Sequence, residues 1–150
     1  MKRQILMAAV VAFLATVGSQ AQAGCSCVAN RVTDGTGVGN ANLTTALSNN
    51  TVCVAKSGGG WEHQEQHKNT GALVDFKLGT NPVDPTTTIG TWSIANSQVT
   101  YSYVGATAPF TYSVCSSTSK PVGGSTIGFC PGTSPTSTID ATIKAGITSC

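Results

Sequence analysis

Two histidines and a glutamate, spaced two residues apart, are the side chains of this sequence best suited to bind a metal ion. They are His63, Glu65 and His67, and they lie in the stretch WEHQEQHK that runs from residue 61 to 68. On a β-strand all three share one face, whereas on a helix His63 and His67 still meet at i, i+4. Two imidazoles and a carboxylate are a ligand set that zinc and copper accept.

A structural role is the competing interpretation of this stretch, and it is the one we favour. Both of its alternating faces are polar, which is typical of a solvated strand end or loop anchored by Trp61. The HExxH pattern of metalloproteases is missing, because Gln64 stands where the catalytic glutamate belongs. The sequence also lacks a nucleophile elbow, a phosphate loop and a dinucleotide fingerprint. We therefore predict no catalytic residue, no cofactor and no enzymatic activity.

Cysteines offer a second kind of chemistry, the formation of disulfide bridges. The six cysteines are Cys25, Cys27, Cys53, Cys115, Cys130 and Cys150. Their spacing contains no CxxC pair of a redox or zinc motif, and it does not choose among the 15 pairings that six cysteines allow. A bridge between Cys115 and Cys130 is favoured, because they end neighbouring predicted strands. Cys150 is expected to join Cys25 or Cys27, and Cys53 the remaining one.

The first 23 residues have the layout of a secretory signal peptide. Lys2 and Arg3 are followed by an apolar run from Ile5 to Val17 and by the small residues of Ala21-Gln22-Ala23. This predicts cleavage after Ala23 and, in a bacterium, a secreted or periplasmic protein whose disulfides persist. Attachment of a lipid to Cys25 is the alternative for this segment. Residues 24–150 then form a single domain without a transmembrane segment.

Charged residues are scarce, and this restricts the partners that the protein can bind. They make up 9% of the chain, against about a quarter in soluble domains. Without Lys2 and Arg3 the eight basic residues become six, which equals the number of acidic residues. A neutral chain offers no electrostatic attraction for phosphate backbones, so nucleic-acid binding is excluded. The same lack of charge leaves self-association open.

Alternating apolar and polar residues predict a chain made mainly of strands. The expected strands cover residues 51–55, 71–79, 88–95, 98–104, 110–115 and 126–130. In the second of them, Ala72 and Val74 share the apolar face, and Asp75 lies on the other. Asn96-Ser97 is expected to form a tight turn. The predicted fold is a small antiparallel meander or barrel-like sheet, stapled by disulfides, with one or two short helices.

Helices are expected in two places outside these strands. The first starts at Asn42 as N-cap and ends at Asn49-Asn50. The second lies in residues 138–147, where Ile139, Ile143 and Ile147 recur at i, i+4. The same residues also alternate as a strand would, and we favour the helix. Residues 24–39 are predicted to be irregular, and residues 131–150 to form a tail that is packed against or bridged to the core.

The motif Gly90-Thr91-Trp92, followed by a meander, resembles the Gly-x-Trp of lipocalin-like barrels. In that family the motif lies on the first strand, whereas here it falls in the middle of the strand series. We therefore infer no ligand and no site residue from the resemblance.

These observations predict an exported, non-catalytic binding or structural module whose ligand the sequence does not identify. The first alternative is a self-associating subunit of a surface or extracellular matrix. The second is a periplasmic metal-binding protein that uses His63 and His67.

Overall fold

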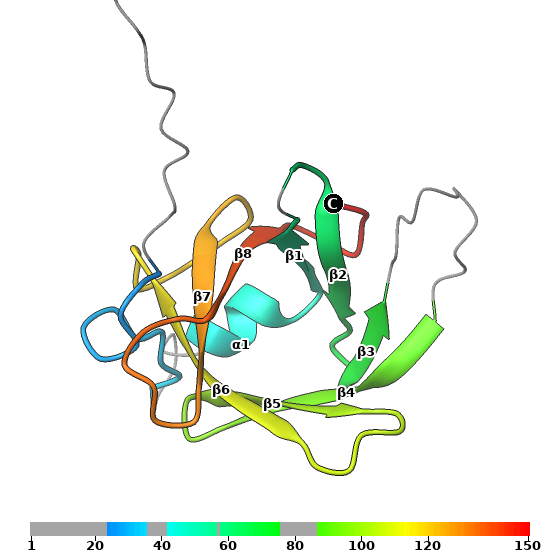
Figure 1. Ribbon diagram of the computed structural model, residues 1–150, viewed down its shortest axis with the longest axis horizontal. Coiled ribbons are helices and arrows are strands. Elements are labelled where there is room, and N and C mark those ends of the chain that lie inside the picture. The colour runs from blue at the N-terminus through cyan, green and yellow to red at the C-terminus, as the bar shows by residue number, and fades with distance from the viewer. Residues whose placement is uncertain (1–23, 36–41, 57, 76–86) are drawn as a thin grey trace, which may run out of the picture.

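Eight antiparallel strands form a closed barrel in the computed structural model, which describes residues 24–35, 42–56, 58–75 and 87–150. Each strand pairs with the next one along the chain, and β8 pairs with β1 to close the ring (Figure 1). The predicted mainly-β fold with a barrel-like meander is thereby confirmed. The strands are β1 Asn50–Ala55, β2 Trp61–His67, β3 Ala72–Asp75, β4 Thr87–Ala95, β5 Gln98–Tyr103, β6 Phe110–Ser116, β7 Thr126–Pro131 and β8 Ile139–Lys144.

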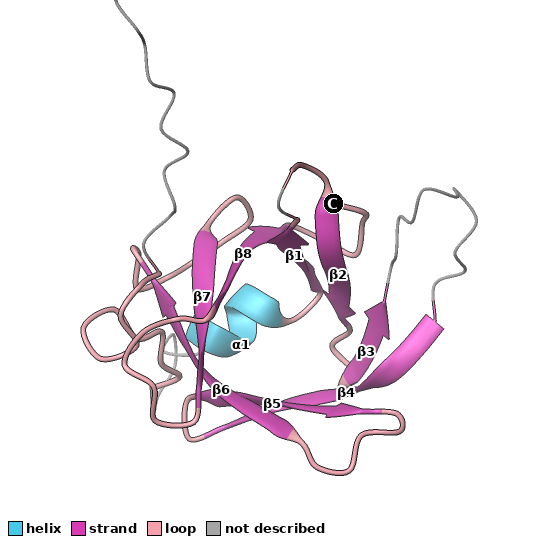
Figure 2. Cartoon of the chain, viewed as in Figure 1, coloured by secondary structure: helices cyan, strands magenta, loops and turns pink. Residues whose placement is uncertain are grey.

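One short helix, α1 (Asn42–Leu47), lies within the ring of strands (Figure 2). Its buried residues Leu43, Ala46 and Leu47 belong to the main apolar core. Since α1 leads directly into the start of β1, it fills the end of the barrel at which β1 begins. We call this the closed end, and the opposite end, at which β1 finishes, the open end.

The helix at this position was predicted, but its cap was assigned to the wrong residue. Asn42 is the first helical residue, and the carboxylate of Asp34 accepts hydrogen bonds from the backbone N–H of Leu43 and Thr44, at 2.7 and 3.0 Å. Asn49 ends the helix with a φ of 55°, a left-handed conformation that asparagine tolerates. The cap therefore comes from the segment before the helix, eight residues upstream of Asn42.

Strands β4 to β6 follow their predicted alternation. Val99 and Tyr101 on β5 and Val114 on β6 point into the core, and each is at most 3% exposed. Asn96 and Ser97 have φ values of 53° and 56°. Positive φ at both central residues is the signature of a type I′ turn, whose twist matches that of the hairpin strands.

Two predictions are wrong: which residues of β3 point into the barrel, and the secondary structure of the tail. On β3 the inward face carries Leu73, which is fully buried in the core, and Asp75, whereas Val74 lies on the opposite face. The rest of that predicted strand lies outside the described residues. In the tail, Ile139 to Lys144 form strand β8 and not a helix, because pairing with both β1 and β7 closes the barrel.

The Gly-x-Trp motif lies in the middle of β4. Trp92 donates from its indole N–H to the carbonyl of Lys68 at 2.9 Å. A Cβ on Gly90 would approach the backbone oxygen of Ser102 on β5 to 2.2 Å, so glycine permits the close contact of these strands.

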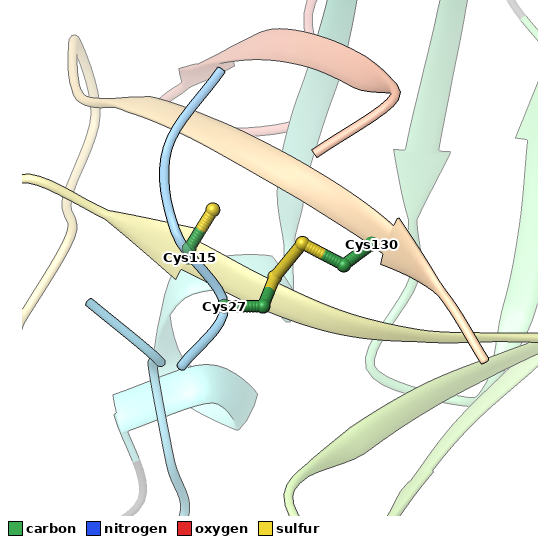
Figure 3. A group of neighbouring side chains, drawn as sticks. All are labelled: Cys27, Cys115 and Cys130. Atoms are coloured by element: carbon green, nitrogen blue, oxygen red, sulfur yellow. A yellow bond between two sulfur atoms is a disulfide. The ribbon is translucent and has the colours of Figure 1, made fainter. Parts of the chain in front are cut away.

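Three disulfides join segments outside the barrel to its wall, and they differ from the predicted pairing. The bridges are Cys25–Cys115, Cys27–Cys130 and Cys53–Cys150. Cys115 and Cys130 do not bridge each other. In the β6–β7 register Cys115 lies opposite Gly128, and Cys130 lies opposite Ser113. The two cysteines are thus offset diagonally, and each bridges to one cysteine of the segment before the helix. Figure 3 shows the bridge between Cys27 and Cys130, with Cys115 on the neighbouring strand.

Glycine at position 128 makes room for this double bridge. A Cβ at that position would lie 2.8 Å from the Sγ of Cys25 and 2.5 Å from the Cβ of Ser137. The segment around Cys25 and Cys27 is also held by backbone hydrogen bonds, such as that from Cys27 N–H to the carbonyl of Pro135 at 2.9 Å. The sulfur of Cys25 cannot carry both the bridge to Cys115 and a lipid thioether, and the alternative of lipidation at Cys25 stays a prediction.

No helix in the described part of the chain is long and apolar enough to cross a membrane. The predicted signal peptide, residues 1–23, lies outside the described residues.

Replacing Cys53 and Cys150 together by serine tests the pairing and its energetic weight. The double variant should contain no free thiol and should unfold with a free energy lowered by about 2–4 kcal/mol, because a long cross-linked loop is released in the unfolded chain. Thiol titration under denaturing conditions and urea unfolding without reductant measure the two effects. Two titratable thiols in the double variant would contradict the pairing.

Candidate ligand-binding site

A cavity of about 540 Å³ occupies the interior of the barrel towards the open end. Helix α1 fills the closed end, where Leu43 and Leu47 are fully buried, so the cavity is confined to the side of the open end. Ligand pockets in proteins have volumes of about 300–1,000 Å³. The cavity is thus large enough for a small organic molecule.

Apolar side chains form most of the cavity wall. The aliphatic members are Val52, Val54, Ile89, Val104 and Ile139. The aromatic members are Tyr101, Tyr103, Phe110, Tyr112 and Phe129. These rings come from β5, β6 and β7 and contact one another in sequence, with centroid distances between 5.9 and 6.3 Å. One side of the cavity is therefore a continuous aromatic wall.

Three ionisable side chains, His63, Glu65 and Asp75, complete the lining. His63 and Glu65 stand two residues apart on β2, and Asp75 lies opposite Glu65 in the β2–β3 register. His63 is the most exposed of the candidate residues, with 57% of its side chain accessible, and lies 4.0 Å from Glu62. A mainly apolar cavity thus contains two carboxyl groups side by side.

Glu65 is the polar group placed deepest against the aromatic wall. Its Oε1 accepts a hydrogen bond of 2.9 Å from the hydroxyl of Tyr103, which reaches across the barrel from β5. Burial raises the pKa of Glu65, and the neighbouring Asp75 adds to the rise, while the Tyr103 hydrogen bond and His63 oppose it. Ionised Glu65 is therefore poorly solvated in the empty cavity.

His67 lies on the same face of β2, deeper in the barrel and fully buried. Its Nδ1 is 3.1 Å from the carbonyl of Glu65, and its Nε2 is 3.0 Å from the hydroxyl of Tyr101. The ring also packs edge-on against Trp92, at a centroid distance of 5.1 Å. Burial lowers the pKa of His67 to about 4, so the imidazole is neutral at physiological pH.

The other face of β2 is covered as well, which sequence reasoning missed. Gln64 and Gln66 are 2% and 4% exposed, and the side-chain oxygen of Gln64 accepts a hydrogen bond from the backbone N–H of Cys150. The segment tied down by the Cys53–Cys150 bridge thus packs on the outside of β2. The interpretation of Trp61 to Lys68 as a solvated segment is wrong for Gln64, Gln66 and His67, which are buried, whereas residues 61–63 are exposed. A polar residue can be buried when a hydrogen bond compensates it.

The predicted metal ligands share a face of β2, as expected for a strand, but their side chains have different surroundings. Both ring nitrogens of His67 are engaged in hydrogen bonds, whereas His63 and Glu65 face the cavity. Among the described residues, the one group of three potential ligand residues whose atoms lie within 4.8 Å of one another is Cys27, Cys115 and Cys130. These sulfurs belong to two disulfides and are not thiolates, so they are no metal ligands in this state.

The aromatic wall and Asp75 were not predicted as site residues. The alternation of Tyr101, Tyr103 and Tyr112 with polar residues gave a signal for one buried face. That signal does not reveal that the barrel encloses a cavity. Comparisons with protein-family models, with curated proteins and with solved structures find no match to this chain.

The buried neutral His67 predicts a loss of stability on acidification. The unfolded chain binds a proton with a pKa near 6.5 and the folded chain near 4, so stability present above pH 6.5 is lost as the pH falls towards 4. A shift of this size corresponds to about 3 kcal/mol. Urea unfolding of the wild type at pH 7 and pH 4.5 measures it.

The variant His67→Gln should lack this part of the pH dependence, whereas His63→Gln, altered at an exposed ring, should keep it. If wild type and His67→Gln lose stability in parallel between these pH values, the buried imidazole is not the responsible group.

Proposed function

We propose that the protein is an exported, non-catalytic binding module whose barrel takes up a small, largely apolar molecule through its open end. The cavity of about 540 Å³, with ten apolar or aromatic residues and three ionisable ones in its wall, is the observation that carries this proposal. Apolar walls with a few placed polar groups are characteristic of small-molecule sites. Transfer of an apolar ligand out of water supplies the affinity, at about 25 cal/mol per Å² of buried apolar surface.

The absence of catalytic activity is part of the proposal. The residues that line the cavity in the described part of the chain include no serine, threonine, cysteine or lysine that could act as a nucleophile. His67, the more buried histidine, has both ring nitrogens in hydrogen bonds within the fold. The residues thus favour retention of a ligand over its conversion.

Export is supported by the sequence of residues 1–23 and by the bridges. Three disulfides fit a compartment in which they persist, such as the bacterial periplasm or the extracellular medium. Every strand of the barrel is paired on both sides in the described residues, so these strands offer no free edge for self-association. The scarcity of charge on which this alternative rests is unchanged, and self-association stays a prediction.

Fluorescence of N-phenylnaphthylamine, a neutral probe that brightens in apolar surroundings, tests the proposal. The wild type should bind the probe saturably, and Val54→Trp should abolish binding because the larger ring fills the cavity. Val122→Trp is the matched control, since Val122 is 62% exposed and lies outside the cavity wall. An equal response of all three proteins would refute a binding site inside the barrel.

A further inference from the structure

The electrostatics of the cavity indicate which head group its ligand carries. Glu65 and Asp75, which occupy facing positions on β2 and β3, both line the cavity. The third ionisable member of the wall is His63, an exposed imidazole. No lysine or arginine is found among the residues of this wall in the described part of the chain. An anionic head group would meet two carboxyl groups of its own sign.

The rings opposite the two carboxyl groups are suited to a cation. Tyr103 links the aromatic rings to the carboxyl groups. Its hydroxyl donates a hydrogen bond to Glu65, while its ring stacks on Tyr101 and packs edge-on against Phe110. Aromatic faces attract ammonium groups, by about 0.5–1 kcal/mol at exposed sites and about 2 kcal/mol or more when water is excluded. A carboxylate beside such rings is the arrangement that recognises an organic ammonium ion.

Resting on the proposed function, we propose that the cavity binds amphipathic amines, with the ammonium group beside Glu65 and Tyr103 and the apolar body against the aromatic wall. The carboxyl group of Glu65 is largely buried, and its ionised form would be stabilised by a second partner beside the Tyr103 hydroxyl. An ammonium ligand supplies that partner.

Binding should depend on pH through Glu65. Its titratable neighbours are His63 on β2, Asp75 on β3, Tyr101 and Tyr103 on β5, and Tyr112 on β6. Because burial raises the pKa of Glu65, acidification protonates this carboxyl group more readily than an exposed glutamate and removes the ion pair. Amine affinity should therefore fall as the pH is lowered from 8 to 5, a range in which an alkylammonium ion with a pKa near 10.4 keeps its charge.

The decisive experiment compares ligands that share one chain and differ in head group. Octylammonium, octanol and octanoate, each below its micelle-forming concentration, are titrated against the probe N-phenylnaphthylamine bound to the full mature protein. Octylammonium should displace the probe about tenfold more effectively than octanol, by the ion pair and the cation–π contact together. Octanoate should be the weakest of the three.

Two variants assign the preference to the carboxyl group. Glu65→Gln should clearly reduce the preference for octylammonium over octanol and weaken its pH dependence, while octanol itself binds as before. Glu62→Gln is the matched control, because Glu62 is an exposed neighbour on β2 outside the cavity wall, and its replacement removes the same charge from the chain. It should leave the preference intact.

The outcomes separate this inference from the proposed function. If octanol and octylammonium bind alike, or if Glu65→Gln keeps the preference, the amine proposal is overturned while an apolar site remains. If neither the probe nor any octyl ligand binds, the proposed function itself fails. A drop in amine affinity that is equal in Glu62→Gln and Glu65→Gln shows a general charge effect and also overturns the proposal.

Discussion

The space inside the eight-stranded barrel is the constraint from which the rest of the structure follows. A barrel of this size is wide enough either to be filled by side chains or to hold one small ligand. Here both solutions are used, each in one half. Helix α1 places Leu43 and Leu47 inside the closed end, and no corresponding element of the described chain fills the open end. The position of the candidate site is therefore a consequence of where the helix lies.

Strand β2 places one buried polar side chain in each half of the barrel, and burial affects the stability of the fold in opposite ways at the two positions. His67 near the closed end is neutral, buried and hydrogen-bonded at both nitrogens, so it contributes to a well-ordered core. Glu65, one step nearer the open end, has a carboxyl group whose ionised form is poorly solvated. A group that folding alone does not favour is a candidate for selection by function. The contrast supports a structural role for His67 and a role in ligand recognition for Glu65.

The sequence predicted those parts of the fold that depend on local pattern. Alternation located β4, β5 and β6, and Asn96-Ser97 marked a turn that only a few residue types form readily. Strand β2 was not among the predicted strands because both of its faces are polar, and the burial of Gln64 depends on a hydrogen bond from the distant Cys150. The isoleucines of β8 fit helix and strand equally, and only the closure of the ring decides between them. The pairing of the cysteines depends on the diagonal offset of Cys115 and Cys130 across two strands, which their spacing in the sequence does not reveal.

The connection between β5 and β6, residues 104–109, lies at the open end and is bridged to no other segment by a disulfide. Val104 at its start is 81% exposed, and Phe110 just after it is 47% exposed, although both line the cavity. The elements that determine the architecture thus lie elsewhere. This hairpin loop can consequently be lengthened or randomised in a library, which makes the barrel a scaffold for selecting receptors with new specificities.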